Sequence, residues 1–225
     1  MSRRLARLTL DNLCDLPVGC QSCLFWELDP VRRERALAAG EGASEKEGWV
    51  SRVLLEWGSC GRVAYVDGDP AGYVLYAPAS YLPGSHAFAT APVSEDAVLL
   101  ATAMVYPDYA GGGLGRALMQ AVAKDLVQRN GGHSTIRAIE AFGDTRNRRR
   151  RGSATYGGCV LPTDYLLGVG FKTHRAHPRN PRMRMELRSV ISWRDEVEAA
   201  LEKLLGVVRP PGVPGPAPTG RSTLR

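Results

Sequence analysis

The residues best suited to chemistry lie in VYPDYAGGGLGRAL at 105–118, where glycines are concentrated between two apolar runs. AVLLATAMVY at 97–106 predicts a buried strand, and apolar residues at three- and four-residue spacing predict a helix over 114–130. A strand that enters a glycine turn and then a helix directs backbone N–H groups toward one point. This predicts a phosphate-binding turn, with a bend that only lets the helix pack on the sheet as the alternative. The glycines are Gly111, Gly112, Gly113 and Gly115.

Two familiar phosphate loops do not fit this stretch. No Lys-Ser or Lys-Thr pair follows the glycines, as a P-loop requires, and the strands before them are expected to be antiparallel. No acidic residue closes a βαβ unit at the separation of a dinucleotide-binding fold. A different class of phosphate-bearing ligand is therefore expected.

The stretch resembles the acyl-CoA-binding motif of the GNAT superfamily of N-acetyltransferases, V-x-P-x-x-[Q/R]-x-x-G-x-[G/A]-x-x-L. The matching residues are Val105, Pro107, Gly113, Gly115 and Leu118, whereas Ala110 takes the place of the usual Gln or Arg. YLLGVGFKTHR, at 165–175, is similar to the short helix, Gly-Phe and strand that close the GNAT fold. The resemblance covers about residues 5–188.

The resemblance implies that acetyl-CoA is a co-substrate whose pyrophosphate is wrapped by residues 110–116. In the family the main contacts there come from backbone N–H groups, so Ala110 removes one side-chain contact at most. The cofactor-binding residues implied are Met104, Val105, Ala110, Gly111, Gly112, Gly113, Leu114, Gly115 and Arg116.

The resemblance also implies the chemistry, in which an amine attacks the thioester directly and the CoA thiolate leaves with a proton. Glu140 matches in position the acidic residue that some GNAT enzymes use, and is our candidate base; a solvated or arginine-paired strand-end carboxylate is the alternative. Many GNAT enzymes carry a tyrosine where this chain has Leu166, and Tyr165 lies one place earlier, so Tyr165 is our candidate acid. Tyr156 or a water are the other options.

Five cysteines make an odd count without an export signal, which favours reduced thiols. Cys20 and Cys23 form a C-x-x-C pair, but no second pair follows it. A structural zinc would need two more ligands from scattered candidates such as Cys14, Cys60 or His86. We expect no metal and interpret these cysteines as packed or mildly reactive thiols, while the zinc alternative stays open for Cys14, Cys20, Cys23 and Cys60.

The composition is that of a globular protein: 225 residues, of which 44% are hydrophobic and 23% charged. No apolar run reaches the roughly 18 residues of a membrane span, and no signal-like segment follows the start, so we expect a cytoplasmic protein without membrane contact. The net charge is +6, with arginines concentrated at 146–151 and 175–184. These segments could attract an anion, a nucleotide phosphate or an acidic acceptor; a nucleic-acid partner is a weaker alternative.

The remaining elements fit the same fold. Runs at 62–66 and 71–77 joined by DGDP predict an antiparallel hairpin, and Ser44 before an acidic first turn predicts the start of a helix that runs to about residue 58. We expect an α/β (α+β) protein with a GNAT-like mixed, mostly antiparallel central sheet flanked by helices.

Three segments are expected along the chain. Residues 1–190 form the GNAT-like domain, an amphipathic run predicts an added helix over 191–208, and the Pro- and Gly-rich residues 209–225 form a disordered tail. The function expected is transfer of an acetyl group from acetyl-CoA to a primary amine of a small molecule or protein, with a homodimer as one option for the assembly. A non-catalytic acyl-CoA-binding sensor is the alternative, favoured by Ala110 and the displaced tyrosine.

Overall fold

The computed structural model describes residues 2–130, 135–146 and 159–190, and a single sheet organises them. In this part of the chain the sheet has eight strands: seven follow the order β1-β2-β3-β4-β5-β8-β7, and the eighth, β6, pairs with β5. The pairs β4–β5 and β5–β6 are parallel and the others antiparallel, which confirms the predicted mixed sheet. The strands are β1 (Arg3–Arg7), β2 (Gly61–Val66), β3 (Asp69–Ala77), β4 (Ala97–Val105), β5 (Ala138–Asp144), β6 (Leu161–Pro162), β7 (Lys172–Arg175) and β8 (Arg182–Glu186).

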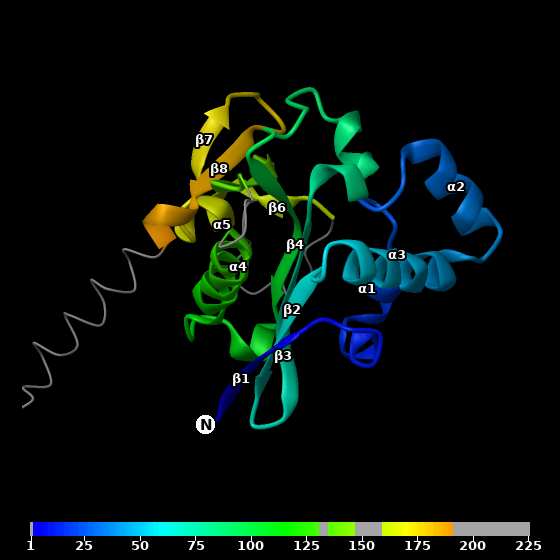
Figure 1. Ribbon diagram of the computed structural model, residues 1–225, viewed down its shortest axis with the longest axis horizontal. Helices are drawn as coiled ribbons and strands as arrows, with labels where there is room; N and C mark the ends of the chain where they lie inside the picture. Colours follow the sequence, from blue (N-terminus) through cyan, green and yellow to red (C-terminus); the bar gives the residue numbers. More distant parts are fainter. Residues whose placement is uncertain (1, 131–134, 147–158, 191–225) are drawn as a thin grey trace, which may run out of the picture. The chain divides into compact units, whose positions relative to one another are not determined.

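Helices cover both faces of this sheet (Figure 1). The α-helices are α1 (Val18–Gln21), α2 (Pro30–Ala38), α3 (Gly42–Glu56), α4 (Leu114–Asn130) and α5 (Thr163–Gly168). Short 3-10 turns are η1 (Leu13–Asp15), η2 (Ala79–Tyr81), η3 (Pro83–Ala87) and η4 (Pro107–Tyr109). None of the described helices is long and apolar enough to cross a membrane. The helix and tail expected over 191–225 lie outside the described residues.

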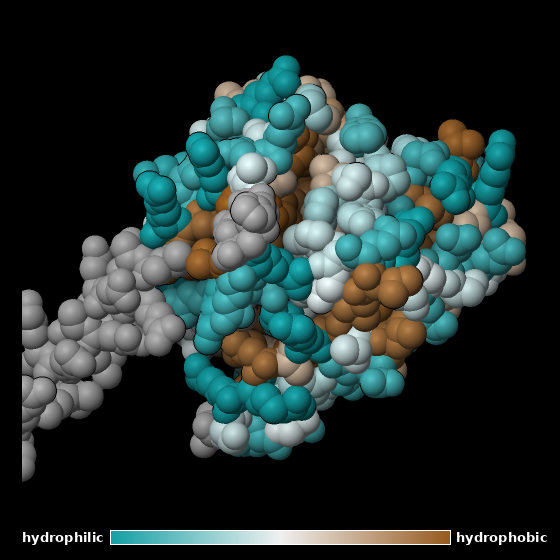
Figure 2. Space-filling view, in the orientation of Figure 1, coloured by the Kyte–Doolittle hydropathy of each residue, from teal (hydrophilic) through white to brown (hydrophobic). Residues whose placement is uncertain are grey.

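The core is divided by the sheet into two apolar clusters. On one face α4 and α5 pack against alternate residues of β3, β4, β5 and β8, while the outward surface of α4 is hydrophilic (Figure 2). On the other face, α3 and the segment around α1 pack against the intervening strand residues, whose side chains point the opposite way. The alternation arises because successive strand side chains point to opposite faces, so each central strand supplies both clusters.

The start of α3 differs from the sequence prediction. The helix begins at Gly42 rather than after Ser44, with Glu41 at the N-cap position. Ser44 therefore lies in the first turn, where its hydroxyl donates to the Glu41 carbonyl at 3.0 Å instead of accepting from the helix N–H groups. A serine can bond to a carbonyl three residues back inside a helix, and this local bond replaces the expected cap.

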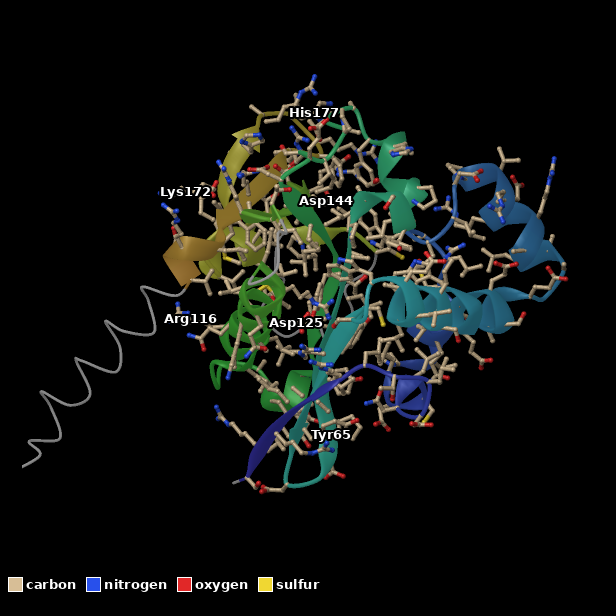
Figure 3. All side chains as sticks on the ribbon, in the orientation of Figure 1. Tyr65, Arg116, Asp125, Asp144, Lys172 and His177 are labelled. Atoms are coloured by element: carbon tan, nitrogen blue, oxygen red, sulfur yellow. The ribbon has the colours of Figure 1, made fainter. Side chains whose placement is uncertain are left out.

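A buried charge cluster joins α4 to the sheet. Asp125 accepts from Arg62 of β2 at 2.6 Å, from Arg129 at 2.9 Å and from the Tyr76 hydroxyl at 2.8 Å. Figure 3 shows Asp125 between α4 and the strands. Burial raises the pKa of the Asp125 carboxyl, but the hydrogen bonds from Arg129 and Tyr76 outweigh it and the net pKa is lowered.

Strand β4 changes its pairing halfway along. Against β3, Tyr76 lies opposite Leu100 and Leu75 opposite Thr102, which leaves one extra β4 residue as a bulge. On its other side β4 pairs with β5 only over Ala97–Leu99. Beyond Leu99 the two parallel strands diverge, and in the described part of the chain the second half of β4 has no strand partner on that side.

Candidate active site

The glycine turn after β4 is open and rich in free donors. Gly111 and Gly113 have φ of +86° and +79°, the left-handed region in which side chains other than glycine are strained. The amide N–H groups of Gly111, Gly112 and Gly113 donate to no acceptor among the described residues. The first turn of α4 adds N–H groups that no helical carbonyl precedes. The N–H groups of Gly111, Gly112 and Gly113 and those of the first turn of α4 thus form a set of donors at a positive helix end, whereas the Ala110 N–H already donates to the Pro107 carbonyl at 3.1 Å.

An arginine from the far end of the chain reaches this turn. Arg3, at the start of β1, donates from Nη1 to the Gly112 carbonyl at 2.9 Å, and its Nη2 lies 3.3 Å from where a Gly112 Cβ would be. Its guanidinium therefore adds positive charge to the glycine turn at Gly112. Arg116 extends outward from the first turn of α4 (Figure 3).

Tyr165 lies against the same turn. A Cβ on Gly115 would lie 3.4 Å from its Cε2, 3.5 Å from its hydroxyl oxygen and 3.6 Å from Val105. The Tyr165 side chain is buried on α5. The predicted candidate acid and the predicted residues Val105 and Gly115 are therefore brought together, although the position on α5 differs from the family's usual tyrosine.

A cavity of about 260 Å³ opens beside the unpaired half of β4. Its walls come from α1 and the segment after it, from α3, from β3, from Thr102–Met104 and from the chain around Cys159 and Leu161. The predicted cofactor residue Met104 is thus at the cavity, whereas Gly111–Gly113 lie beyond the end of the strand. Strand β4 connects the two features.

Glu27 and Lys46 form a buried ion pair in the wall of this cavity. Each side chain is 2% exposed, the Lys46 ammonium contacts Glu27 Oε1, and it also donates to the Cys23 carbonyl at 3.1 Å. The second oxygen, Glu27 Oε2, accepts from the Trp26 N–H at 3.2 Å. Burying such an ion pair costs folding free energy unless its remaining polar atoms are also hydrogen-bonded. Because the pair lies at a cavity, we consider its two residues candidates for a functional role.

Three thiols line the same cavity. Cys23 Sγ and Cys159 Sγ are 3.2 Å apart, and Cys20 Sγ accepts from the Tyr73 hydroxyl at 2.9 Å. Hydrogen bonding with Cys159 lowers the pKa of Cys23 from 9.0 to about 6, and the same contact raises the pKa of Cys159. No group of three or more His, Cys, Asp or Glu side chains is arranged to hold a metal ion in residues 2–130, 135–146 and 159–190.

Glu140 lies on β5, at the last position that pairs with β4. Its carboxylate is fully buried, 3.1 Å from Arg184 Nη1 and 3.3 Å from Arg182 Nη1, and it accepts from the Ser94 N–H at 3.1 Å. His174 Nε2 is 3.9 Å away. Glu140 is not among the described residues that line the cavity. Its role as a base stays a prediction, and these contacts are those of the arginine-paired alternative.

Sequence reasoning did not find Arg3, Glu27 or Lys46. Arg3 and Gly112 are 109 residues apart, and Glu27 and Lys46 come from different segments. A charged residue inside an otherwise apolar stretch, as in CLFWEL, was the one available signal for Glu27. Tyr156 and the arginines at 147–151 lie outside the described residues.

The comparisons with known proteins agree with this geometry. The model of the acetyltransferase (GNAT) family matches residues 24–151. No curated protein was found to match the chain by sequence.

Solved structures are similar at the level of the fold. Aminoglycoside acetyltransferase AAC(6')-Ib in complex with coenzyme A is 16% identical, covers 85% of this chain and 98% of its own, and has a TM-score of 0.50. The same enzyme with ribostamycin and coenzyme A is 15% identical, with 85% of this chain and 97% of the other aligned and a TM-score of 0.50. PaiA N-acetyltransferase from Thermoplasma acidophilum, in complex with coenzyme A, is 12% identical, with 83% of this chain and 99% of the other aligned and a TM-score of 0.49.

Proposed function

Because the chain belongs to the GNAT acetyltransferase family, we propose that it transfers an acetyl group from acetyl-CoA to the amine of an acceptor bound in the cavity beside β4. The observation that carries this proposal is the continuity of three features: the free donors of Gly111–Gly113, the unpaired half of β4, and the cavity at Thr102–Met104. In the same order, these features would bind the pyrophosphate of acetyl-CoA, its extended amide-containing pantetheine arm and its thioester end.

In this proposal the backbone does most of the binding. The N–H groups of the glycine turn and the first turn of α4 hold the pyrophosphate, and Arg3 adds a charge-assisted contact. The unpaired β4 backbone offers N–H and C=O groups to the amides of the pantetheine arm, as an edge strand does to an added strand. The thioester then lies next to Thr102–Met104, at the cavity.

The cavity offers a carboxylate to a primary amine. Glu27 lines it, and although Lys46 balances its charge, its oxygens remain hydrogen-bond acceptors. A carboxylate has about four acceptor positions, so Glu27 can accept from Lys46 and Trp26 and still from the acceptor. We therefore propose Glu27 as a second candidate base, in addition to Glu140. Removal of a proton from the ammonium prepares the amine for attack on the thioester.

Tyr165 is the proposed acid for the departing thiolate. It contacts the position of a Gly115 Cβ and lies near Val105, where β4 passes into the glycine turn. A tyrosine hydroxyl carries one proton that it can donate.

The test is an acceptor screen with acetyl-CoA. The panel contains aminoglycosides, small primary amines and peptides with free amino termini. Released CoA is separated by chromatography, because the exposed and half-buried cysteines would react with a thiol dye. Acceptor-dependent CoA release together with an acetylated product supports the proposal. Acetyl-CoA binding in calorimetry without release for any acceptor would favour the sensor alternative instead.

A further inference from the structure

Cys23 and Cys159 are placed for covalent bonding although 136 residues separate them. Their sulfur atoms are 3.2 Å apart, and a disulfide needs about 2.05 Å, so a movement of about 1.2 Å brings them into bonding distance. Both cysteines are partly exposed and border the cavity. A small oxidant and a reducing thiol can therefore reach them.

The backbone on each side of this pair is fixed. The Cys23 carbonyl accepts from the Lys46 ammonium at 3.1 Å, and the Cys159 carbonyl accepts from Trp26 Nε1 at 2.9 Å. Trp26 is in turn stacked on Phe88 and Phe142, with ring centroids 5.2 Å and 6.0 Å away. The contact between the two sulfur atoms is thus supported by the core and does not depend on side-chain rotamers alone.

We propose that Cys23 and Cys159 form a reversible intramolecular disulfide when the protein meets a peroxide, with Cys23 as the attacking thiol and Cys159 as the resolving thiol. The Cys23 thiolate attacks one peroxide oxygen, so an S–O bond forms, the O–O bond breaks and the departing hydroxide takes up a proton as water. The Cys159 sulfur then attacks Cys23 Sγ, so the S–S bond forms and the S–O bond breaks. The second hydroxide leaves with the Cys159 proton as water, and two thiols are oxidised as one peroxide is reduced.

The assignment of the two roles follows from their surroundings. A thiolate is the nucleophile toward peroxide, and Cys23 has the lowered pKa while that of Cys159 is raised. After the hydrogen bond with Cys159, burial raises the pKa of Cys23 and a hydrogen bond with the Phe25 backbone lowers it, while the charges of Glu27 and Lys46 act on it in opposite directions. Cys20 is the competing partner, because it borders the same cavity, but its sulfur is engaged by the Tyr73 hydroxyl.

The test is mass spectrometry of the full chain after brief treatment with dilute hydrogen peroxide. The proposal expects an intact mass lower by about 2 Da, the loss of two hydrogens, with the mass restored by dithiothreitol. Peptide mapping without reduction should give one linked peptide pair that contains Cys23 and Cys159. Because the disulfide is detected directly, this result does not depend on whether the proposed acetyl transfer is correct.

Variants distinguish the roles of the cysteines. Cys159→Ser should leave a sulfenic acid at Cys23 that dimedone traps, whereas Cys23→Ser should give no trapped adduct at Cys159. Cys14→Ser, on the exposed turn η1, and Cys20→Ser should both still form the disulfide. A Cys20–Cys23 linkage, a disulfide between two chains, or sulfinic acid without a linked peptide in the wild-type protein would overturn the proposal.

Discussion

The Arg3 guanidinium donates to the Gly112 carbonyl at 2.9 Å and so joins the first strand to the glycine turn. Because Arg3 is exposed and its charge is screened, we expect it to contribute moderately to the proposed phosphate binding. We predict that Arg3→Met raises the Kd of acetyl-CoA about threefold to tenfold in calorimetry at low salt. The difference should shrink as salt is added. Arg7→Met, at the other end of β1, is the matched control, and an equal effect of both variants would contradict a specific role for Arg3.

A substitution at Gly113, compared with one at Gly40, separates the effect of backbone strain from the effect of lost phosphate contact. Gly113→Asp places a side chain at φ of +79° and a carboxylate beside the proposed pyrophosphate. Gly40→Asp introduces the same strain at φ of +74° after α2, and neither Cβ would meet an atom within 4 Å. Both variants should lose about 1–2 kcal/mol of stability.

Only Gly113→Asp should lose acetyl-CoA affinity, by about tenfold to a hundredfold, since like charges a few ångströms apart repel. Thermal unfolding gives the first quantity and calorimetry the second. If Gly113→Asp binds acetyl-CoA as well as Gly40→Asp does, the phosphate site lies elsewhere.

The sequence was most informative where structure depends on neighbouring residues. The run from β4 through Gly111–Gly113 into α4 is continuous in the chain, so its composition alone indicated a strand, a turn and a helix. Glu27 and Lys46 meet only because α3 packs beside the segment after α1, and Cys159 joins Cys23 only because the sheet places β6 near that segment. Contacts of this kind depend on topology, and no local pattern encodes them.

Asp125 should be among the residues that matter most for stability. Asp125→Asn removes the charge that compensates Arg62, which is buried, and breaking a buried pair from one side costs about 3–5 kcal/mol. Thermal unfolding at pH 7 should show a large fall in Tm. Glu34→Gln, an exposed carboxylate on α2, is the control and should change Tm little.

The pH dependence of the Asp125→Asn effect follows from the lowered pKa of Asp125. A carboxyl whose pKa is lowered by folding stabilises the protein above its unfolded value of 3.8, and that contribution is lost as the pH falls through the folded value. The Tm difference between wild type and variant should therefore be constant above about pH 5 and narrow below about pH 4. A difference that widens on acidification would contradict this origin.

Cys23 should react with alkylating reagents at unusually low pH. Because its pKa is lowered to about 6, the thiolate is present above that pH, and the rate of carbamidomethylation by iodoacetamide should rise through a midpoint near pH 6. Peptide mass spectrometry separates this rate from that of the other cysteines. In Cys159→Ala the hydrogen bond that lowers the pKa is removed, so the midpoint should move upward. An unchanged midpoint would show that the hydrogen bond with Cys159 does not set this reactivity.

The last prediction concerns which carboxylate accepts the proton of the acceptor amine. Glu27 lines the cavity, whereas Glu140 is held by Arg182 and Arg184. If Glu27 is the base, Glu27→Gln should lower kcat about 10²- to 10⁴-fold with little change in the Kd of acetyl-CoA, and the loss should shrink as rising pH deprotonates the amine beforehand. Glu140→Gln should then mainly lower Tm, because two arginines lose part of their compensation.

A stability control is needed because Glu27→Gln leaves the Lys46 ammonium buried without its counter-charge. The double variant Glu27→Gln/Lys46→Met removes both charges, so its Tm should recover toward the wild-type value while its kcat stays low. Recovery of kcat together with Tm would show that Glu27 acts only through folding. A kcat loss of the predicted size in Glu140→Gln, with the pH rescue and an unchanged Tm, would instead assign the base to Glu140, as its position on β5 first indicated.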